Sequence, residues 1–392
     1  MRHTVGDKLR VLEHLTMKLS LRLLCLSTLV SVGGFAGVQP LAVTVMEQQG
    51  LAATSIGVLS GLIFGGVLLL APFQPALAVR FGAMRTYQAG KLLAVVGFLG
   101  CGWATTPWLW AGALLLLGLA GALTWPLTDT LIATEAPAAE KGAWLGLFQA
   151  GMGIAFAAGP FLAAIFGQWP HAVFAGAAAL AALSSLPLIG QSLPAVAEDT
   201  DEGAGFAAAW RSAAGLTFVA FLGGLFENGT HTAGTLVALA RGWSAPAAVA
   251  LCGVMALGSF VIQRPLGRAA DRRGTRGVTL WGLAILALSL AVLPLVQVWP
   301  ALLWLLGLVW GGASGCLYTL AMTGTAQAVP ERQVAAATTF MVLGYTLGSA
   351  LGPVVGGLAV DAAPLAGVAW VFGVLAVTGW LFVLRQKRTP AV

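Results

Sequence analysis

The feature that most constrains this chain is a series of twelve apolar runs, each long enough to cross a membrane as a helix. Such a helix needs about 20 mostly apolar residues to span about 30 Å of hydrocarbon, and it satisfies its own backbone hydrogen bonds in lipid. The expected spans are 20–46, 55–79, 86–104, 108–134, 142–167, 171–189, 212–240, 245–266, 277–297, 299–328, 334–361 and 365–384. We therefore predict an all-α membrane protein with twelve transmembrane helices.

The composition excludes the main alternatives. Hydrophobic residues make up 58% of the chain and charged residues only 9%, whereas soluble chains carry roughly 25% charge. This much apolar surface excludes a soluble nucleic-acid-binding protein, despite the net charge of +6, and it also excludes a disordered chain. The first apolar run is too long for a cleavable signal peptide and has no small-residue cleavage site after it.

The basic residues predict the orientation in the membrane. With twelve spans both chain ends lie on one side, and nineteen of the twenty Lys and Arg residues then fall on that side, leaving only Arg241 opposite. The positive-inside rule places this side in the cytoplasm. We expect a multi-pass protein of the cell inner membrane with both termini cytoplasmic. Lys91, which enters the third span from this side, is expected to snorkel toward the aqueous surface.

Short motifs recur at a nearly constant offset close to half the chain length. The offsets are 190 to 194 residues, and each copy contains six spans, which is an even number. The halves therefore share one orientation and form a parallel repeat about an axis along the membrane normal, built as two six-helix bundles. The matches pair Gly33-Gly34 with Gly223-Gly224, Arg80-Phe81-Gly82 with Arg272-Arg273-Gly274, Gly118, Gly121 and Leu123 with Gly312, Gly315 and Leu317, and Gly159-Pro160 with Gly352-Pro353.

This repeat divides the chain into five parts. The segment between the bundles is the longest polar stretch between spans, and its acidic residues indicate a flexible cytoplasmic linker. The N-terminal tail is either a short amphipathic surface helix or a disordered basic tail. The expected parts are a tail over 1–19, a bundle over 20–189, the linker over 190–211, a bundle over 212–384 and a tail over 385–392.

The loop after the eighth span carries a family resemblance. Residues 267–276 read G-R-A-A-D-R-R-G-T-R, which resembles the G-x-x-x-D-R-x-G-R-R loop of the major facilitator superfamily. Residues 311–357 resemble a bacterial subgroup of small twelve-helix carriers, the YcaD-like type. The first-half copy of the loop has Val79 where the acidic residue would stand. The resemblance implies the major facilitator fold and a cytoplasmic gating role for Asp271, Arg272, Arg276, Arg80 and Arg85.

The resemblance also implies a central cavity lined mainly by the first, fourth, seventh and tenth helices. In the seventh span Glu227 lies close to mid-membrane, and His231 follows at i+4 on the same helix face. An intramembrane carboxylate is costly, so it is normally paired, protonated or functional. We predict proton coupling by Glu227, His231 and Asp129. A structural Glu227–His231 pair and a salt-bridged gate at Asp129 remain alternatives. No Cys/His cluster supplements the pair, so we expect no metal.

Substrate contacts are expected on the same four helices. The tenth span carries an aromatic and sulfur stripe that indicates either substrate binding or core packing, and a buried Tyr hydroxyl there needs a partner. The candidates are Gln39, Trp125, Asn228, Trp310, Tyr318 and Met322.

A glycine pattern in the eleventh span predicts a hinge and a packing surface. It resembles the family's G-x-x-x-G-P-x-x-G-G pattern, which in the fifth helix is associated with antiporters, although the complete copy here lies in the eleventh. Small residues allow close helix approach, and proline loosens the helix. The hinge candidates are Gly159, Pro160, Gly348, Gly352, Pro353 and Gly356.

Together these features predict a monomeric secondary transporter that works by alternating access and exports small amphipathic or weakly cationic molecules by proton antiport. No G-x-x-x-x-G-K-[ST] loop, G-x-S-x-G motif or H-E-x-x-H motif occurs, so we expect neither a nucleotide cofactor nor an enzyme. Its partners are then the substrate, protons and the bilayer. Two alternatives remain: proton-coupled uptake of a neutral solute such as a sugar, and a non-transporting membrane receptor or assembly factor on a carrier fold.

Overall fold

The computed structural model describes residues 2–137, 140–191 and 206–386, and the regular structure in these ranges is helical. Residues 192–205 of the predicted linker and 387–392 of the predicted C-terminal tail lie outside them. The helices of the first half are α1 (Arg2–Gln48), α2 (Ala53–Leu70), α3 (Gln74–Phe81), α4 (Ala83–Trp103), α5 (Pro107–Glu135), α6 (Lys141–Ile165) and α7 (Pro170–Ser185). Those of the second half are α8 (Phe206–Ala240), α9 (Ala245–Arg273), α10 (Thr275–Val292), α11 (Leu302–Ala328), α12 (Glu331–Ala362) and α13 (Ala366–Arg385).

Each predicted span overlaps a helix, but not every helix is strongly apolar. Within the described ranges, eleven helical segments are long and apolar enough to cross a membrane, and α4 is not among them. The first half of α4 carries Arg85, Gln88 and Lys91, which lower its mean hydropathy. The eleven segments show a multi-pass membrane protein.

Three predicted spans are divided near one end by proline. Proline lacks a backbone N–H and cannot continue the helical hydrogen-bond ladder. Pro72 lies in a short 3₁₀ turn over Ala71–Phe73, between α2 and α3. Similar turns over Leu186–Leu188 and Leu293–Gln297 follow α7 and α10. These breaks change the local direction of the helix without adding a crossing.

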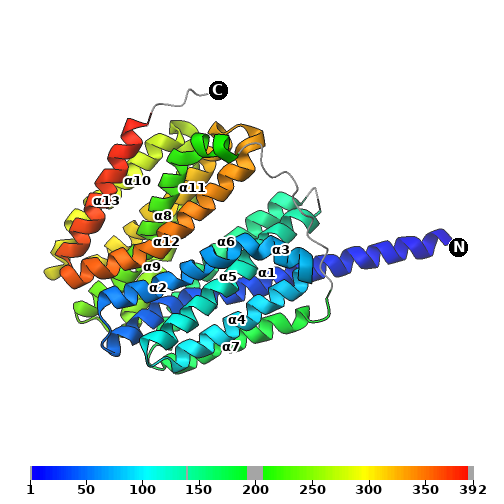
Figure 1. The fold of residues 1–392 in the computed structure, drawn as a ribbon, viewed down its shortest axis with the longest axis horizontal. Helices are drawn as coiled ribbons and strands as arrows, with labels where there is room; N and C mark the ends of the chain where they lie inside the picture. The colour runs from blue at the N-terminus through cyan, green and yellow to red at the C-terminus, as the bar shows by residue number, and fades with distance from the viewer. Residues whose placement is uncertain (1, 138–139, 192–205, 387–392) are drawn as a thin grey trace.

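The helices form two groups that follow the order of the chain. Figure 1 shows α1–α7 on one side and α8–α13 on the other, meeting at one end and diverging toward the upper right of the view. The groups touch where α2 packs on α12 and α6 packs on α9. At the α2–α12 contact, the backbone of Pro353 faces Gly57 and that of Ala350 faces Gly61. Side chains larger than hydrogen would separate the two groups there.

Two glycine turns repeat between the halves. Gly82 has φ 88° and ψ 145°, and Gly274 has φ 77° and ψ 147°, so both adopt a conformation that residues with a Cβ rarely take. They stand 192 residues apart. Gly50 (φ 81°) and Gly242 (φ 77°) form a second positive-φ pair at the same offset. The connections after the first and second spans of each half therefore contain a glycine with positive φ at matching positions.

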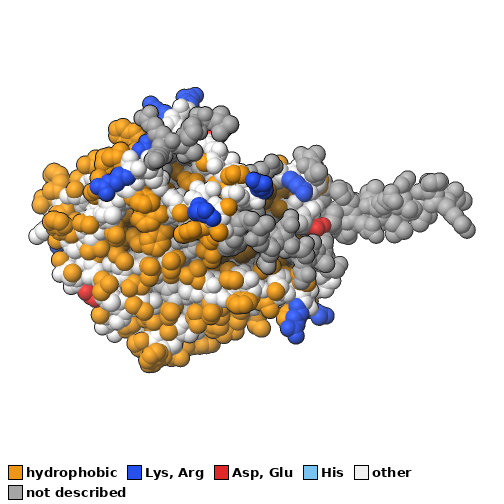
Figure 2. Space-filling view, turned by 45° about the horizontal axis from the view of Figure 1, so that its top comes forward, with side chains coloured by type: hydrophobic (Ala, Val, Ile, Leu, Met, Phe, Trp, Pro, Cys, Tyr) orange, Lys and Arg blue, Asp and Glu red, His pale blue; other side chains and the backbone are white. Residues whose placement is uncertain are grey.

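The outer surface is apolar over most of the view in Figure 2, where Lys and Arg side chains lie toward the top and right of the molecule. Large apolar side chains are well exposed, among them Trp108 at 86%, Leu147 at 74% and Trp370 at 73%. Soluble monomers rarely expose continuous apolar patches above a few hundred Å². A lipid environment accounts for this surface.

The close α2–α5 contact gives a stability prediction. A Cβ on Gly118 would collide with the backbone carbonyl of Ile63 in α2, whereas Gly112, on the same helix, faces open space. We expect Gly118→Ala to destabilise the protein by about 1–3 kcal/mol, because the two helices must separate. The matched Gly112→Ala should be neutral or slightly stabilising, since alanine favours helix. Thermal unfolding of both variants at one scan rate measures this, and equal midpoints would contradict the packing argument.

Candidate functional site

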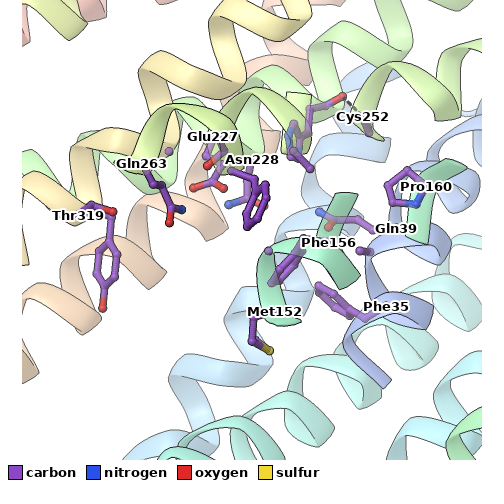
Figure 3. A pocket seen from close by; sticks show the side chains of 18 of the residues that line it. Phe35, Gln39, Met152, Phe156, Pro160, Glu227, Asn228, Cys252, Gln263 and Thr319 are labelled. Carbon is purple, nitrogen blue, oxygen red and sulfur yellow. Dashed lines mark hydrogen bonds between the residues drawn. The ribbon is translucent and has the colours of Figure 1, made fainter. Parts of the chain in front are cut away.

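A cavity of about 820 Å³ lies between the two groups of helices. Figure 3 shows side chains from both halves pointing into it. Helices α1, α2, α5 and α6 supply one wall, and helices α8, α9, α11 and α12 supply the other. Its lining includes Phe35, Gln39, Trp125, Gln149, Phe156, Pro160, Glu227, Asn228, His231, Thr232, Thr235, Cys252, Phe260, Gln263, Arg264, Tyr318, Thr319 and Tyr345.

Two adjacent polar residues of α8 are held by α12. The Tyr345 hydroxyl donates a 2.8 Å hydrogen bond to the Glu227 carboxylate. One turn further along α12, the Ser349 hydroxyl accepts a 3.0 Å bond from the Asn228 amide. These bonds orient an intramembrane carboxylate at the cavity wall.

His231 also lines the cavity, one turn beyond Glu227. Among the hydrogen bonds of the described residues, none involves its imidazole ring. The Glu227 carboxylate bonds to Tyr345 instead, so the direct carboxylate–imidazole pair considered from the sequence is not formed here. The His231 carbonyl accepts bonds from Thr235 and Cys252, which fix the backbone and leave the ring free to interact with a ligand.

The facing wall is aromatic. Phe35 of α1 packs edge-on against Trp125 of α5 with ring centroids 5.4 Å apart, and Trp125 packs similarly against Phe156 of α6 at 6.1 Å. Gln39 lies one turn beyond Phe35, and its amide nitrogen is buried without a hydrogen-bond partner in the described part of the chain. A buried donor of this kind normally has an acceptor, so it marks a position for one.

The remaining proton-coupling and substrate candidates divide between the cavity and its surroundings. Tyr318 lines the cavity and packs against Tyr345 at 4.7 Å. Asp129 does not line it, but its carboxylate accepts a 3.3 Å bond from Gln149, which does. Trp310 and Met322 lie outside the lining. Trp310 is fully buried and donates to Ser289, so it belongs to the packed core.

Several lining residues lie on helices other than the four from which the sequence predicts the cavity lining. Tyr345 comes from α12, Gln149 from α6, and Gln263 and Arg264 from α9. The sequence signal that could have pointed to Tyr345 is the rarity of tyrosine, since the chain has only three. Two of the three line the cavity.

The cavity is open toward one side. Gln149, near the start of α6, and Gln263 and Arg264, near the end of α9, are exposed lining residues. At the opposite end the Asp361 carboxylate of α12 accepts hydrogen bonds from the first-turn amides of α2, at 3.0 Å from Ala53 and 2.8 Å from Thr54. The halves are thus joined on one side and apart on the other.

The predicted gating residues lie on the open side without the expected ion pairs. Asp271 and Arg272 are exposed, and no salt bridge joins Asp271 to an arginine within the described ranges. Arg276 instead donates to the carbonyls of Val383 and Leu384, at 3.1 and 2.7 Å. Cations favour helix C-termini, so this arginine ties the loop to the end of α13.

In the first half, Arg85 is exposed, as is Arg80, whose guanidinium lies 5.3 Å from the centre of the neighbouring Phe81 ring. Both arginines therefore lie on the surface at the start of α4 and the end of α3.

The predicted hinge glycines pack within each half. Gly348 and Gly352 lie against the α8 backbone near Phe221 and Leu225, and Gly356 lies against Gly229. In the first half, Gly159 lies against Gly33 of α1. Contact between the halves instead involves the α12 face that carries Pro353, while Pro160 lines the cavity.

Comparison with known proteins agrees with this architecture. A family model described as Major Facilitator Superfamily matches residues 24–262 and 216–392. YfkF of Bacillus subtilis (strain 168), an uncharacterised MFS-type transporter, is 25% identical over 339 residues, covering 84% of this chain and 86% of YfkF. YcaD of Salmonella heidelberg (strain SL476), another uncharacterised MFS-type transporter, is 23% identical over 316 residues, covering 79% and 80%.

Solved structures share the fold. The nucleoside transporter NupG superimposes with a TM-score of 0.76 at 15% identity, covering 94% of this chain and all of NupG. A bacterial homologue of the lysosomal transporter Spinster, in an inward-facing and unoccupied conformation, gives 0.68 at 16% identity, covering 96% and 99%.

Proposed function

The chain belongs to the Major Facilitator Superfamily, and on that premise we propose that it is a proton-coupled secondary transporter that exports small amphipathic or weakly cationic molecules by antiport. Alternating access moves a central site from one side of the membrane to the other without a hydrolysed cofactor. The observation that carries the proposal is a carboxylate, Glu227, at the wall of a cavity between the two halves.

We propose the membrane arrangement that the sequence predicts. In it α4 also crosses the membrane, in addition to the eleven strongly apolar segments. The twelve crossings then form two six-helix bundles, over 20–189 and 212–384. Both ends face the cytoplasm of the inner membrane, and one chain is the working unit. The distribution of basic residues supports this orientation. The cavity then opens to the cytoplasm, where an exported substrate loads.

Glu227 and His231 are the proposed coupling groups, with Asp129 assisting near the opening. Glu227 and His231 line the cavity, where a proton and a cationic substrate compete for the carboxylate. Such competition is the simplest chemistry of antiport, because loading one ligand displaces the other. Asp129 is connected to the cavity through Gln149.

The proposed substrate class follows from the facing walls. Phe35, Trp125 and Phe156 offer aromatic faces to an apolar body or a cation. Gln39 offers an amide donor, and Asn228 and Tyr318 add polar contacts at the lining. A weakly basic aromatic molecule that also carries a hydrogen-bond acceptor fits these groups.

One observation favours a second candidate, the proton-coupled uptake of a neutral solute such as a sugar. Four amide side chains line the cavity: Gln39, Asn228, Gln149 and Gln263. Amides bind hydroxyl groups as both donors and acceptors. Two of these four, Gln149 and Gln263, lie on α6 and α9, outside the helices from which the sequence predicts the cavity.

Proteoliposomes with an imposed pH gradient separate the two candidates. Antiport predicts that a lipophilic amine moves against the proton flow and that adding it releases protons from the lumen. Uptake predicts that a neutral solute moves with the protons. If no tested compound moves and the pH gradient does not decay, the protein is not the proposed carrier. That result favours a receptor or assembly factor.

Tyr345 gives a prediction for the coupling site. Tyr345→Phe keeps the ring and removes the only hydroxyl bonded to the Glu227 carboxylate among the described residues. A hydrogen bond to a charged group is worth about 1.5–3 kcal/mol, so the exchange rate should fall by about 10- to 100-fold. The double variant with Glu227→Gln should be no slower than Glu227→Gln alone, because Tyr345 acts through Glu227. Additive losses would contradict that role.

A further inference from the structure

Lys91 of α4 is buried deep in the first half. Its side chain is 2% exposed, so the predicted snorkelling is wrong. The ammonium group donates to the backbone carbonyl of Ser27 at 3.0 Å, to the Ser184 hydroxyl at 3.0 Å and to the Ser31 hydroxyl. These three oxygens, from α1 and α7, satisfy all three of its N–H groups and hold the side chain inside the bundle.

None of these acceptors carries a charge. Of the titratable groups on the surrounding helices, Tyr87 bonds to Thr28, and Cys25 lies on α1. Asp129 of α5 bonds to Gln149, and no carboxylate pairs with Lys91 within the described ranges. A desolvated ammonium without a counter-charge is costly, by several kcal/mol even after relaxation. No described side chain supplies a counter-charge for it.

A small cavity is lined by Lys91 and by Ser31, one of its hydrogen-bond acceptors. Its volume is about 20 Å³, enough for one water molecule or one small ion. Ser31 accepts from Lys91, so its own O–H remains available to donate into this space. The rest of the lining is apolar apart from Thr124. The lining residues are Ser31, Phe35, Lys91, Ala94, Phe98, Leu117, Ala120, Gly121, Thr124 and Trp125.

We propose that this small cavity binds one monovalent anion of chloride size, attracted by the charge of Lys91 and held by a hydrogen bond from the Ser31 hydroxyl. The small volume favours such an ion over sulfate or an organic carboxylate. Phe35 and Trp125 line both this cavity and the large one, so the anion reaches its site when that aromatic pair moves. The site neutralises the buried cation and is separate from the Glu227 coupling site.

Chloride titration of the purified full-length protein tests this proposal. The thermal unfolding midpoint is measured in sodium chloride against sodium gluconate at constant ionic strength, with sodium bromide and sodium sulfate as further arms. A ligand of the folded state stabilises it in a saturable way. We expect a saturable rise of the midpoint with chloride and bromide, whereas sulfate, which stabilises folded proteins generally by exclusion from their surface, should add no saturable component. Equal midpoints in chloride and gluconate would show that water fills the cavity and would overturn the proposal.

Variants locate the effect. Lys91→Met should abolish the chloride response, whereas Lys141→Met, which removes a cation outside this cavity, should keep it. If Lys91→Met does not fold, Ser31→Ala serves instead and should weaken the apparent chloride affinity by about tenfold, as expected for one hydrogen bond to an ion. A chloride response that is unchanged in Lys91→Met or in Ser31→Ala would refute the assignment.

Discussion

Glu227→Gln should reduce pH-driven substrate movement in proteoliposomes to the level of protein-free vesicles while leaving the fold intact. Glutamine matches glutamate in shape, and its carbonyl oxygen can still accept the Tyr345 hydrogen bond. It cannot bind or release a proton near neutral pH, so the coupling step is lost. The measurement is accumulation of a lipophilic amine under an imposed gradient, together with lumenal pH.

A matched control uses another glutamate. Glu47 is exposed near the end of α1 and does not line the cavity, so Glu47→Gln should transport normally. Exchange without a gradient separates coupling from binding. A Glu227→Gln protein that still exchanges substrate has lost coupling alone, whereas one that loses both has lost the substrate site. Normal coupled accumulation would disprove the role of Glu227.

Asp361→Ala should shift the protein away from the conformation described here. Its carboxylate joins the halves through two bonds to the first turn of α2, and opening on that side must break both. Carboxylates near helix N-termini are stabilised by the free amides and the helix dipole. We expect a population shift of about 1–3 kcal/mol, roughly 5- to 150-fold. Asp361→Asn should fall between, since one acceptor oxygen remains.

Spin-label distances measure this shift. Labels on Gln48 and Ala362, which are exposed in different halves near Asp361, report the separation on the joined side. Wild type should show mainly the short distance, and Asp361→Ala a larger share of long ones. Identical distributions would mean that the packing of α2 on α12 closes this side without help from the carboxylate.

The helices could be predicted from the sequence because length and hydrophobicity alone mark them. Every expected span overlaps a helix, and the departures at Pro72, Pro187 and Pro294 come from a missing backbone donor. The hydropathy of α4 is lower because that helix carries polar groups that tertiary structure satisfies. Burial of Lys91 among serine oxygens is a property of packed helices, and no single segment reveals it.

The site was predictable only in part, for a geometric reason. Within the predicted span over 212–240, Glu227 and His231 are the only ionisable residues, so they and the adjacent Asn228 could be identified from the sequence as cavity candidates. On α11 the periodic stripe gave the spacing of Trp310 and Tyr318 but not the direction of each side chain. Helix crossing decides that direction, and it turns Trp310 into the core and Tyr318 into the cavity.

The repeated glycine turns also record the history of the molecule. Gly50 and Gly82 stand 32 residues apart, as do Gly242 and Gly274, so no net insertion or deletion separates the two copies over this stretch. At the offset these turns define, Lys91 corresponds to Leu283, which is equally buried. The two halves therefore share backbone turns at one offset while single interior side chains differ, so that Lys91 occupies a position that corresponds to the apolar Leu283.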